Sequence, residues 1–281
     1  MGILGCHVSI SGGVQNAPHR AAELGCETMQ IFTRNAQRWA SKPLAQEQAD
    51  GFKAGVKEQG LQEVMAHGSY LTNLASPDPR IHKLSVAAFE DELDRSEALG
   101  IPYFVIHPGS HKGTSFQEGL HTLTISLRRS LANRPDYKVM LLLETTAGGG
   151  KSLGGSFEHL AEILDQTAMP GRLGVCLDTA HVFAAGYDIR TQAGYEETLD
   201  AFKTQIGFGL LKAFHVNDSR SSLNSHHDIH ADIGEGKIGL EAFRLLVNDP
   251  RFKHHPMNLE TPGDEAAFQR NLQRLYDLRR L

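Results

Sequence analysis

The chain is 281 residues long with 40% hydrophobic and 22% charged residues, so it can bury a sizeable core and is neither disordered nor fibrous. Its formal net charge of −5, taken alone, disfavours a nucleic-acid partner, because such proteins normally carry a basic surplus. No apolar run approaches the ~18 residues of a membrane span, and we expect no signal peptide. The three cysteines show no C-x-x-C spacing, which is typical of buried thiols in a reducing cytoplasm.

Short apolar runs alternate with amphipathic segments along the whole chain. The runs predicted as strands are 3–9, 28–33, 62–67, 103–107, 138–144, 173–178, 211–216 and 257–260. Helical patterns cover 45–59, 81–99, 116–133, 156–167, 192–206, 239–248 and 264–280. Eight strand–helix units in one series predict a single-domain α/β fold over residues 1–281, the (β/α)8 TIM barrel. The alternative is a doubly wound open sheet, whose reversal of strand order a sequence does not reveal.

Six of the eight predicted strands have, at or next to their C-terminal end, a side chain that can bind a metal ion. The strand-end residues of this kind are His67, His107, Glu144, Asp178, His215 and Glu260. In a parallel barrel these ends share the face on which active sites lie. Two loop segments, 178–181 and 226–230, contribute His181, Asp228 and His230.

These nine side chains offer only nitrogen and oxygen donors, which favours zinc or another transition metal over magnesium or calcium. One tetrahedral zinc takes at most four ligands, whereas three zinc ions with one bridging carboxylate would use all nine. Glu144 is the predicted bridge, because its strand lies centrally among the others. Each residue also has a structural alternative: a lone histidine is commonly just hydrogen-bonded, Asp178 could be a helix N-cap, and 226–230 could be an exposed loop.

Several segments resemble endonuclease IV, the zinc-dependent apurinic/apyrimidinic endonuclease family of base-excision repair. The resemblance runs from 5–9 to 259–262, and its most specific segments are H-P-G-S-H (107–111), V-C-L-D-T-A-H (175–181), F-A-A-G-Y-D (183–188), H-V-N-D (215–218) and I-G-E-G (233–236). It implies a (β/α)8 barrel with three zinc ions. By resemblance the ligands are His67 and His107 for one ion, Asp178, His215 and Glu260 for a second, and His181, Asp228 and His230 for the third, with Glu144 bridging the first two.

The resemblance implies a hydrolase that cleaves the phosphodiester 5′ to an abasic site in double-stranded DNA, with Glu144 and Glu260 as catalytic residues. The products would be a 3′-hydroxyl and a 5′-deoxyribose phosphate, and removal of 3′-blocking groups would be a second activity. We expect a cytoplasmic monomer with no membrane association and three Zn2+ per chain, Mn2+ being an alternative at one site. Three Zn2+ would bring the formal net charge to about +1, which weakens the argument from net charge against a nucleic-acid partner.

The resemblance also predicts the side chains that contact DNA. Tyr70 and Leu71 follow His67 in a loop placed to enter the gap at the lesion, the alternative being that they pack within the loop, and Gln37 with Arg38 beside it lies in a loop that probes the DNA. Apart from the resemblance, basic residues near the predicted rim could contact the DNA backbone or be ordinary solvated charges: Arg34, Arg38, Lys42, Lys112, Lys151, Arg220 and Lys237. An abasic nucleotide lacks pairing and stacking partners, so its extrusion costs less than the flipping of a normal nucleotide.

Three positions depart from the family pattern. Thr145 stands where the family usually has asparagine after the bridging glutamate, and Ile229 stands where it has arginine between two ligands. Gln37 aligns with a loop arginine that probes the DNA. These departures concern the DNA contacts and the surroundings of the ligands, and leave the ligand set itself intact.

Two other functions are compatible with a metal-binding barrel. A sugar isomerase or epimerase would use one or two metals, an enclosed pocket and a lysine or carboxylate base, and the group His181, Asp228 and His230 would have no role in it. A non-catalytic zinc protein that recognises DNA lesions would saturate its metal coordination and bind without turnover.

Overall fold

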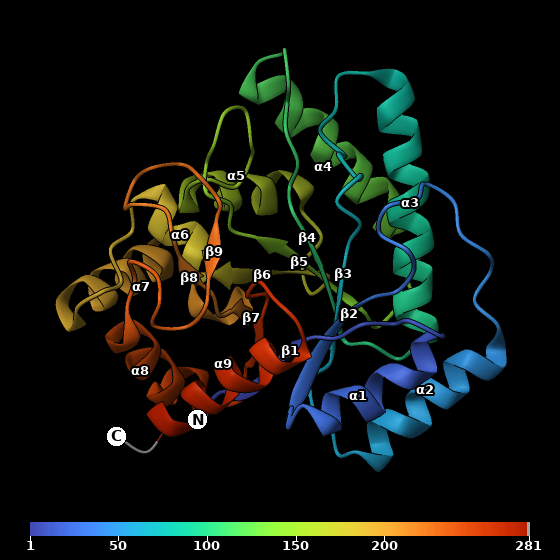
Figure 1. Cartoon of the computed structure of the whole chain (residues 1–281). Coiled ribbons are helices and arrows are strands. Elements are labelled where there is room, and N and C mark those ends of the chain that lie inside the picture. Colours follow the sequence, from blue (N-terminus) through green and yellow to red (C-terminus); the bar gives the residue numbers. More distant parts are fainter. Residues whose placement is uncertain (280–281) are drawn as a thin grey trace.

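Eight parallel strands close into a barrel at the centre of the molecule (Figure 1). The computed structural model describes residues 1–279. The barrel strands are β1 (Ile3–His7), β2 (Thr28–Phe32), β3 (Met65–His67), β4 (Tyr103–Ile106), β5 (Met140–Glu144), β6 (Leu173–Asp178), β7 (Leu211–His215) and β10 (Pro256–Leu259). They pair in the order β1-β10-β7-β6-β5-β4-β3-β2, and closure between β1 and β2 excludes an open sheet. The predicted (β/α)8 barrel is confirmed.

Helices connect the strands and surround the barrel (Figure 1). They are α1 (Ala17–Glu23), α2 (Gln46–Glu58), α3 (Pro79–Ala98), α4 (Phe116–Ala132), α5 (Phe157–Thr167), α6 (Thr179–Ala185), α7 (Gln192–Gln205), α8 (Leu240–Asn248) and α9 (Glu265–Leu278), with 3-10 turns at Val14–Asn16, Phe208–Leu210 and Pro250–Phe252. The predicted helical segments are found, although the end predicted at residue 280 lies outside the described residues. Helices α1 and α6 were not predicted, because seven residues are too few to display a helical period.

Several strands are shorter than predicted. β1 ends at His7 and β3 begins only at Met65, whereas β4 and β10 end one residue before His107 and Glu260. A small antiparallel pair, β8 (Asp218–Ser219) and β9 (His230–Ala231), was not predicted, because two-residue strands carry no alternation. This pair ties the long loop after β7 into a hairpin.

The strands bury both faces. Their outer faces join the helices in one large core, and a second cluster takes one side chain from each of five adjacent strands: Met65, Val105, Leu142, Cys176 and Ala213. Because side chains on a barrel strand alternate between inside and outside, this second cluster fills the barrel interior. Within residues 1–279, no helix combines the length and the apolar character that crossing a bilayer would require.

Candidate metal centre

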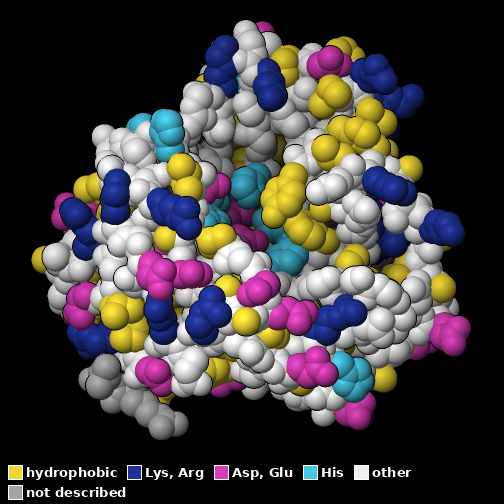
Figure 2. Space-filling view, viewed as in Figure 1, with side chains coloured by type: hydrophobic (Ala, Val, Ile, Leu, Met, Phe, Trp, Pro, Cys, Tyr) yellow, Lys and Arg dark blue, Asp and Glu magenta, His cyan; other side chains and the backbone are white. Residues whose placement is uncertain are grey.

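The predicted site residues lie directly above the apolar barrel interior. Residues two apart on a strand share a face, and His67 follows Met65 by two positions, as Glu144 follows Leu142. The same spacing relates Val105 to His107, Cys176 to Asp178 and Ala213 to His215. Alternation therefore aims these side chains into the C-terminal mouth of the barrel. Figure 2 shows histidine and acidic side chains gathered at the bottom of a hollow on this face.

Glu144 lies at the centre of the cluster and is fully buried. Its Oε2 is 3.1 Å from Nε2 of both His67 and His107, which come from the neighbouring strands β3 and β4. Its Oε1 is 2.8 Å from Nδ1 of His215 at the end of β7. The two oxygens of this carboxylate thus face different sets of imidazoles, as a bridging ligand requires.

On the side of β7 and β10, Glu260 and Asp178 complete the group around His215. Glu260 Oε2 is 3.3 Å and Asp178 Oδ2 is 4.0 Å from His215 Nδ1. One donor atom from each of Glu144, Asp178, His215 and Glu260 lies within 4.8 Å of the others.

The third group combines α6 with the loop after β7. Asp228 Oδ2 is 3.0 Å from His181 Nε2, and its Oδ1 is 3.1 Å from His230 Nε2. Asp178 Oδ2 lies 3.8 Å from His230 Nε2, so this carboxylate faces both the second and the third group. Segment 226–230 is thus exposed in part, but Asp228 and His230 turn inward toward His181.

Asp178 is also the helix N-cap that the alternative interpretation proposed. Its Oδ1 accepts a hydrogen bond from the backbone N–H of His181 at 2.9 Å, while Oδ2 faces the cluster. The capping bond starts α6 at Thr179 and places His181 in its first turn, beside Asp228. Asp178 therefore caps α6 with one carboxylate oxygen and faces the cluster with the other.

Opposite charges shape the protonation of the cluster. Burial alone would raise the pKa of Glu144, but His107 and His215 more than offset it and hold that pKa well below its usual range. The pKa of Glu260 is lowered in the same way, chiefly by His215 against the effect of burial. Burial lowers the pKa of His230, yet Asp228 and Asp178 raise it to about 9. Positive charge located between the carboxylates and the imidazoles therefore stabilises the ionised carboxylates.

The residues present fit metal ions as the source of that charge. The donors are imidazole nitrogens and carboxylate oxygens, the set that transition metals prefer. Nε2 of His230 is buried without a hydrogen-bond partner in the described part of the chain, although it faces Asp228 and Asp178. Metal-capable triads also form from His67, His107 and Glu144 and from Asp178, His181 and His230.

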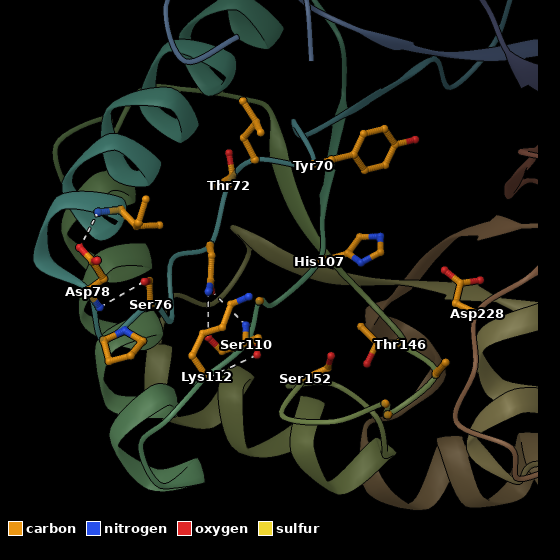
Figure 3. Close-up of a pocket in the computed structure, with 18 of the residues that line it drawn as sticks. Tyr70, Thr72, Ser76, Asp78, His107, Ser110, Lys112, Thr146, Ser152 and Asp228 are labelled. Carbon is orange, nitrogen blue, oxygen red and sulfur yellow. Dashed lines mark hydrogen bonds between the residues drawn. The ribbon is translucent and has the colours of Figure 1, made fainter. Parts of the chain in front are cut away.

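An open cavity of about 690 Å3 adjoins the cluster. Figure 3 shows His107 and Asp228 at one side of it and Ser110 and Lys112 at the other. The hydroxyl and ammonium groups that line the cavity are suited to the oxygens of a phosphate backbone.

The comparisons with known proteins agree with this geometry. Residues 18–278 match the family model described as a xylose isomerase-like TIM barrel. The chain is 47% identical over 279 residues to a protein of Chloroflexus aggregans named probable endonuclease 4, covering 99% of this chain and 98% of that one. The crystal structure of endonuclease IV from Thermus thermophilus superimposes with a TM-score of 0.86 at 34% identity, over 98% of each chain.

The chain belongs to the endonuclease IV family. A D-tagatose 3-epimerase-like protein also superimposes, with a TM-score of 0.73 and coverage of 99% of this chain and 98% of that one, and at 19% identity this likeness shows the fold alone.

The predicted DNA-contacting residues lie in different environments. Tyr70 is 71% exposed, stands at the edge of the cavity and packs edge-on against Phe32 with ring centroids 5.3 Å apart. Leu71 is half-buried and lines the same cavity, while Gln37 and Arg38 are exposed. Tyr70 and Leu71 are therefore accessible from the cavity.

Arg34, predicted at the rim, is buried below the surface. Its side chain is buried, with its Nε 3.1 Å from Glu92 of α3 and 3.5 Å from Asp91. Glu92 in turn accepts a hydrogen bond from the backbone N–H of Ser69 at 3.1 Å. Arg34 therefore supports the loop that carries Tyr70 from within the protein, and its contact with DNA stays a prediction from the sequence.

Two departures from the endonuclease IV pattern have distinct surroundings. Thr145 supports the cluster with two atoms: its Oγ1 accepts from the N–H of Asp178 at 2.9 Å, and its carbonyl pairs with Nδ1 of His181 at 2.8 Å. Ile229 is 50% exposed between Asp228 and His230, so an apolar side chain faces solvent at the rim.

Three polar residues beside the cluster were not predicted: Asn217 and Gln30, which are buried, and His7, which is partly buried. Asn217 donates to Asp178 Oδ2 at 2.7 Å, and Gln30 and His7 contact Glu260 from β2 and β1. A signal existed for the last two, because each is a polar residue at an inward position of an apolar strand. The order of strands around the barrel was needed to show that β1 and β2 stand next to β10.

Proposed function

We propose that this chain cleaves the phosphodiester bond 5′ to an abasic site in double-stranded DNA, leaving a 3′-hydroxyl and a 5′-deoxyribose phosphate, and also removes 3′-blocking groups. The observation that carries the proposal is the convergence of nine donor side chains, spread from residue 67 to residue 260, at one barrel mouth. Membership of the endonuclease IV family supports the same reaction class.

We assign three Zn2+ ions to these donors. His67 and His107 would hold one ion, Asp178, His215 and Glu260 a second, and His181, Asp228 and His230 the third, with Glu144 shared by the first two. When bound, such ions make water acidic enough to act as a nucleophile near neutral pH and stabilise charge on phosphate oxygens. Mn2+ at one site is the alternative that metal analysis would detect.

The catalytic carboxylates hold the cations in place. The imidazoles keep the pKa values of Glu144 and Glu260 below their usual range, so both side chains are ionised at neutral pH. A carboxylate in that state holds cations and does not act as a proton donor. We therefore assign both residues to positioning positive charge against the phosphate.

Substrate binding is assigned to the rim of the cavity. Tyr70 and Leu71 would occupy the gap left by the missing base, where an aromatic ring replaces the lost stacking. Gln37 and Arg38 would contact the backbone from the exposed segment before α2. Three Zn2+ would change the formal net charge from −5 to +1 and concentrate positive charge where a phosphate would lie. A cytoplasmic location and a monomeric state remain predictions from the sequence.

Incubation with a duplex containing one abasic site, with and without a strong chelator, tests the proposal. We expect a single cut 5′ to the lesion that the chelator suppresses. Intact DNA with protein shown to hold its full zinc complement would refute it: binding without turnover indicates a lesion-recognition protein, and turnover of a ketose instead indicates an epimerase.

Two variants test the residue assignment. Glu144→Ala and Glu260→Gln should abolish cleavage, because each removes an anionic ligand from the cluster. His121→Ala is a matched control, since His121 is an exposed histidine on α4. Near-normal rates for either glutamate variant would show that the metal assignment is wrong.

A further inference from the structure

Three histidines of the cluster each place Nδ1 against a backbone carbonyl oxygen. Nδ1 of His67 lies 2.8 Å from the carbonyl of Gly68, and Nδ1 of His230 lies 3.1 Å from the carbonyl of Glu260. Nδ1 of His181 pairs with the carbonyl of Thr145. A carbonyl only accepts, so each of these nitrogens carries the proton and leaves Nε2 free to face the carboxylates.

His215 is oriented the other way round, and by a side chain. Its Nδ1 faces Glu144 and Glu260, while its Nε2 lies 2.8 Å from Oε1 of Gln30. The amide oxygen of Gln30 can only accept, so it places the proton on Nε2 and leaves the Nδ1 lone pair directed at the cluster.

The remaining hydrogen bonds of Gln30 fix the direction of its amide. Its Nε2 donates to Glu260 Oε1 at 2.6 Å and lies 3.1 Å from Nδ1 of His7. The Glu260 carboxylate can only accept, and the amide nitrogen of Gln30 is its donor. Gln30 is fully buried, so water does not compete for these groups. A reversed amide would set its oxygen against the Glu260 carboxylate, which excludes that orientation.

We propose that Gln30 is a positioning residue that holds His215 and Glu260, two assigned ligands of one metal ion, in their binding orientations. The inference rests on the metal assignment of the proposed function. It extends that assignment to β2, from which none of the nine assigned donors comes. Removing the amide frees the His215 ring to change tautomer and lets the Glu260 carboxylate rotate, and losses of this kind typically weaken metal affinity 10–100-fold.

A purely structural role for Gln30 makes a different prediction. In that case its loss would lower stability as the loss of any buried hydrogen bond does, without a selective effect on metal. Thr28 supplies the matched control: it is buried two residues earlier on the same face of β2, and its Oγ1 donates to the carbonyl of Glu63 at 3.1 Å, away from the cluster. Thr28→Val removes one buried hydrogen bond of this strand without touching an assigned ligand.

The experiment compares Zn2+ retention in the wild type, Gln30→Met, Gln30→Leu and Thr28→Val. Each protein is loaded with Zn2+, equilibrated with graded chelator and assayed for metal by mass spectrometry, with circular dichroism to verify the fold. We expect both Gln30 variants to release one equivalent of zinc at 10–100-fold lower chelator strength, and Thr28→Val to match the wild type. Methionine and leucine differ in shape, so a folding failure of one leaves the other to decide.

Substitution with Co2+ adds a spectroscopic measurement. The visible absorption bands of bound Co2+ depend on its ligand geometry, so loss of His215 or Glu260 orientation should change one component of the spectrum in the Gln30 variants alone. Unchanged zinc retention and an unchanged Co2+ spectrum in a folded Gln30 variant would overturn the inference, as would an equal loss of zinc in Thr28→Val. A wild type that binds no Zn2+ would instead overturn the proposed function, so the two failures are distinguishable.

Discussion

Removal of metal should make the stability of this protein unusually sensitive to alkaline pH. In the metal-free protein, positive charge within the cluster comes from protons on its histidines. Burial lowers the pKa of His230, but Asp228 and Asp178 raise it to about 9, well above the unperturbed value of about 6.5. Burial also lowers the pKa values of the other cluster histidines, but nearby groups more than offset it. Glu144 and Glu260 raise the pKa of His67. Asp178 and Asp228 raise that of His181. Cys176, Glu260 and Glu144 raise that of His215.

Proton linkage gives the direction in which stability changes with pH. A histidine whose pKa is raised by folding stabilises the folded state fully below pH ~6.5, and this contribution is lost as the pH rises through the folded pKa near 9. At ~1.4 kcal/mol per pKa unit, His230 alone accounts for up to about 3 kcal/mol between these limits. Its partner Asp228 is nearly half exposed, so solvent screening reduces the figure.

Urea denaturation of metal-free protein between pH 6.5 and 9.5 measures this effect. We expect the free energy of unfolding to fall across the range in the metal-free wild type, and the fall to be smaller in Asp228→Asn, which lacks the charge that raises the pKa of His230. The zinc-loaded protein should not share the fall, because metal ligation needs neutral imidazoles and is favoured as protons leave. A metal-free wild type whose stability is constant or rises over this range would refute the reasoning.

The other predictions concern residues around the cluster. Arg34→Met should lower the free energy of unfolding by about 1–3 kcal/mol, because it leaves Glu92, whose pKa burial raises to about 7, with only the Ser69 N–H as a partner; a stable variant with weaker, less salt-dependent DNA binding would instead place Arg34 at the DNA. Tyr70→Ala should leave the melting temperature within a few degrees while raising KM for an abasic duplex, and equal KM values would argue against its placement in the lesion gap. Asp218 is a buried carboxylate that accepts from the backbone N–H groups of Gly234, Gly236 and Ile238, so Asp218→Asn should cost about 2–4 kcal/mol and release one zinc equivalent by loosening the hairpin, as metal analysis would show.

Much of the site is readable from local pattern. A polar residue at the end of an apolar run, as in Leu143–Glu144 or Leu177–Asp178, stands out against its neighbours, and the alternation of a strand directs it inward. The number of such runs predicted the barrel, and a barrel collects its strand ends on one face. The approach of His67, Glu144 and His215 is therefore a consequence of residue type and order along the chain.

Contacts that depend on barrel closure could not be read in this way. Gln30 reaches Glu260 across 230 residues of sequence because β1, the strand between them in the barrel, brings β2 close to β10. Arg34 appeared in the sequence as one basic residue among several near the rim, and only the approach of Glu92 on α3 shows that it is buried. The hairpin of β8 and β9, which turns Asp228 inward, is too short to have a period.

The difference between the features that the sequence predicted and those that it did not has a physical origin. Alternation and helical period express the direction of each side chain relative to its own backbone, and this information is local. The sequence by itself therefore determined the eight barrel strands, most helices and the nine candidate donors. Hydrogen-bond partners and ion pairs depend on which strand or helix comes to lie beside which. Only the closed barrel decided that Gln30 orients His215, and that Arg34 supports the loop of Tyr70 from inside the protein.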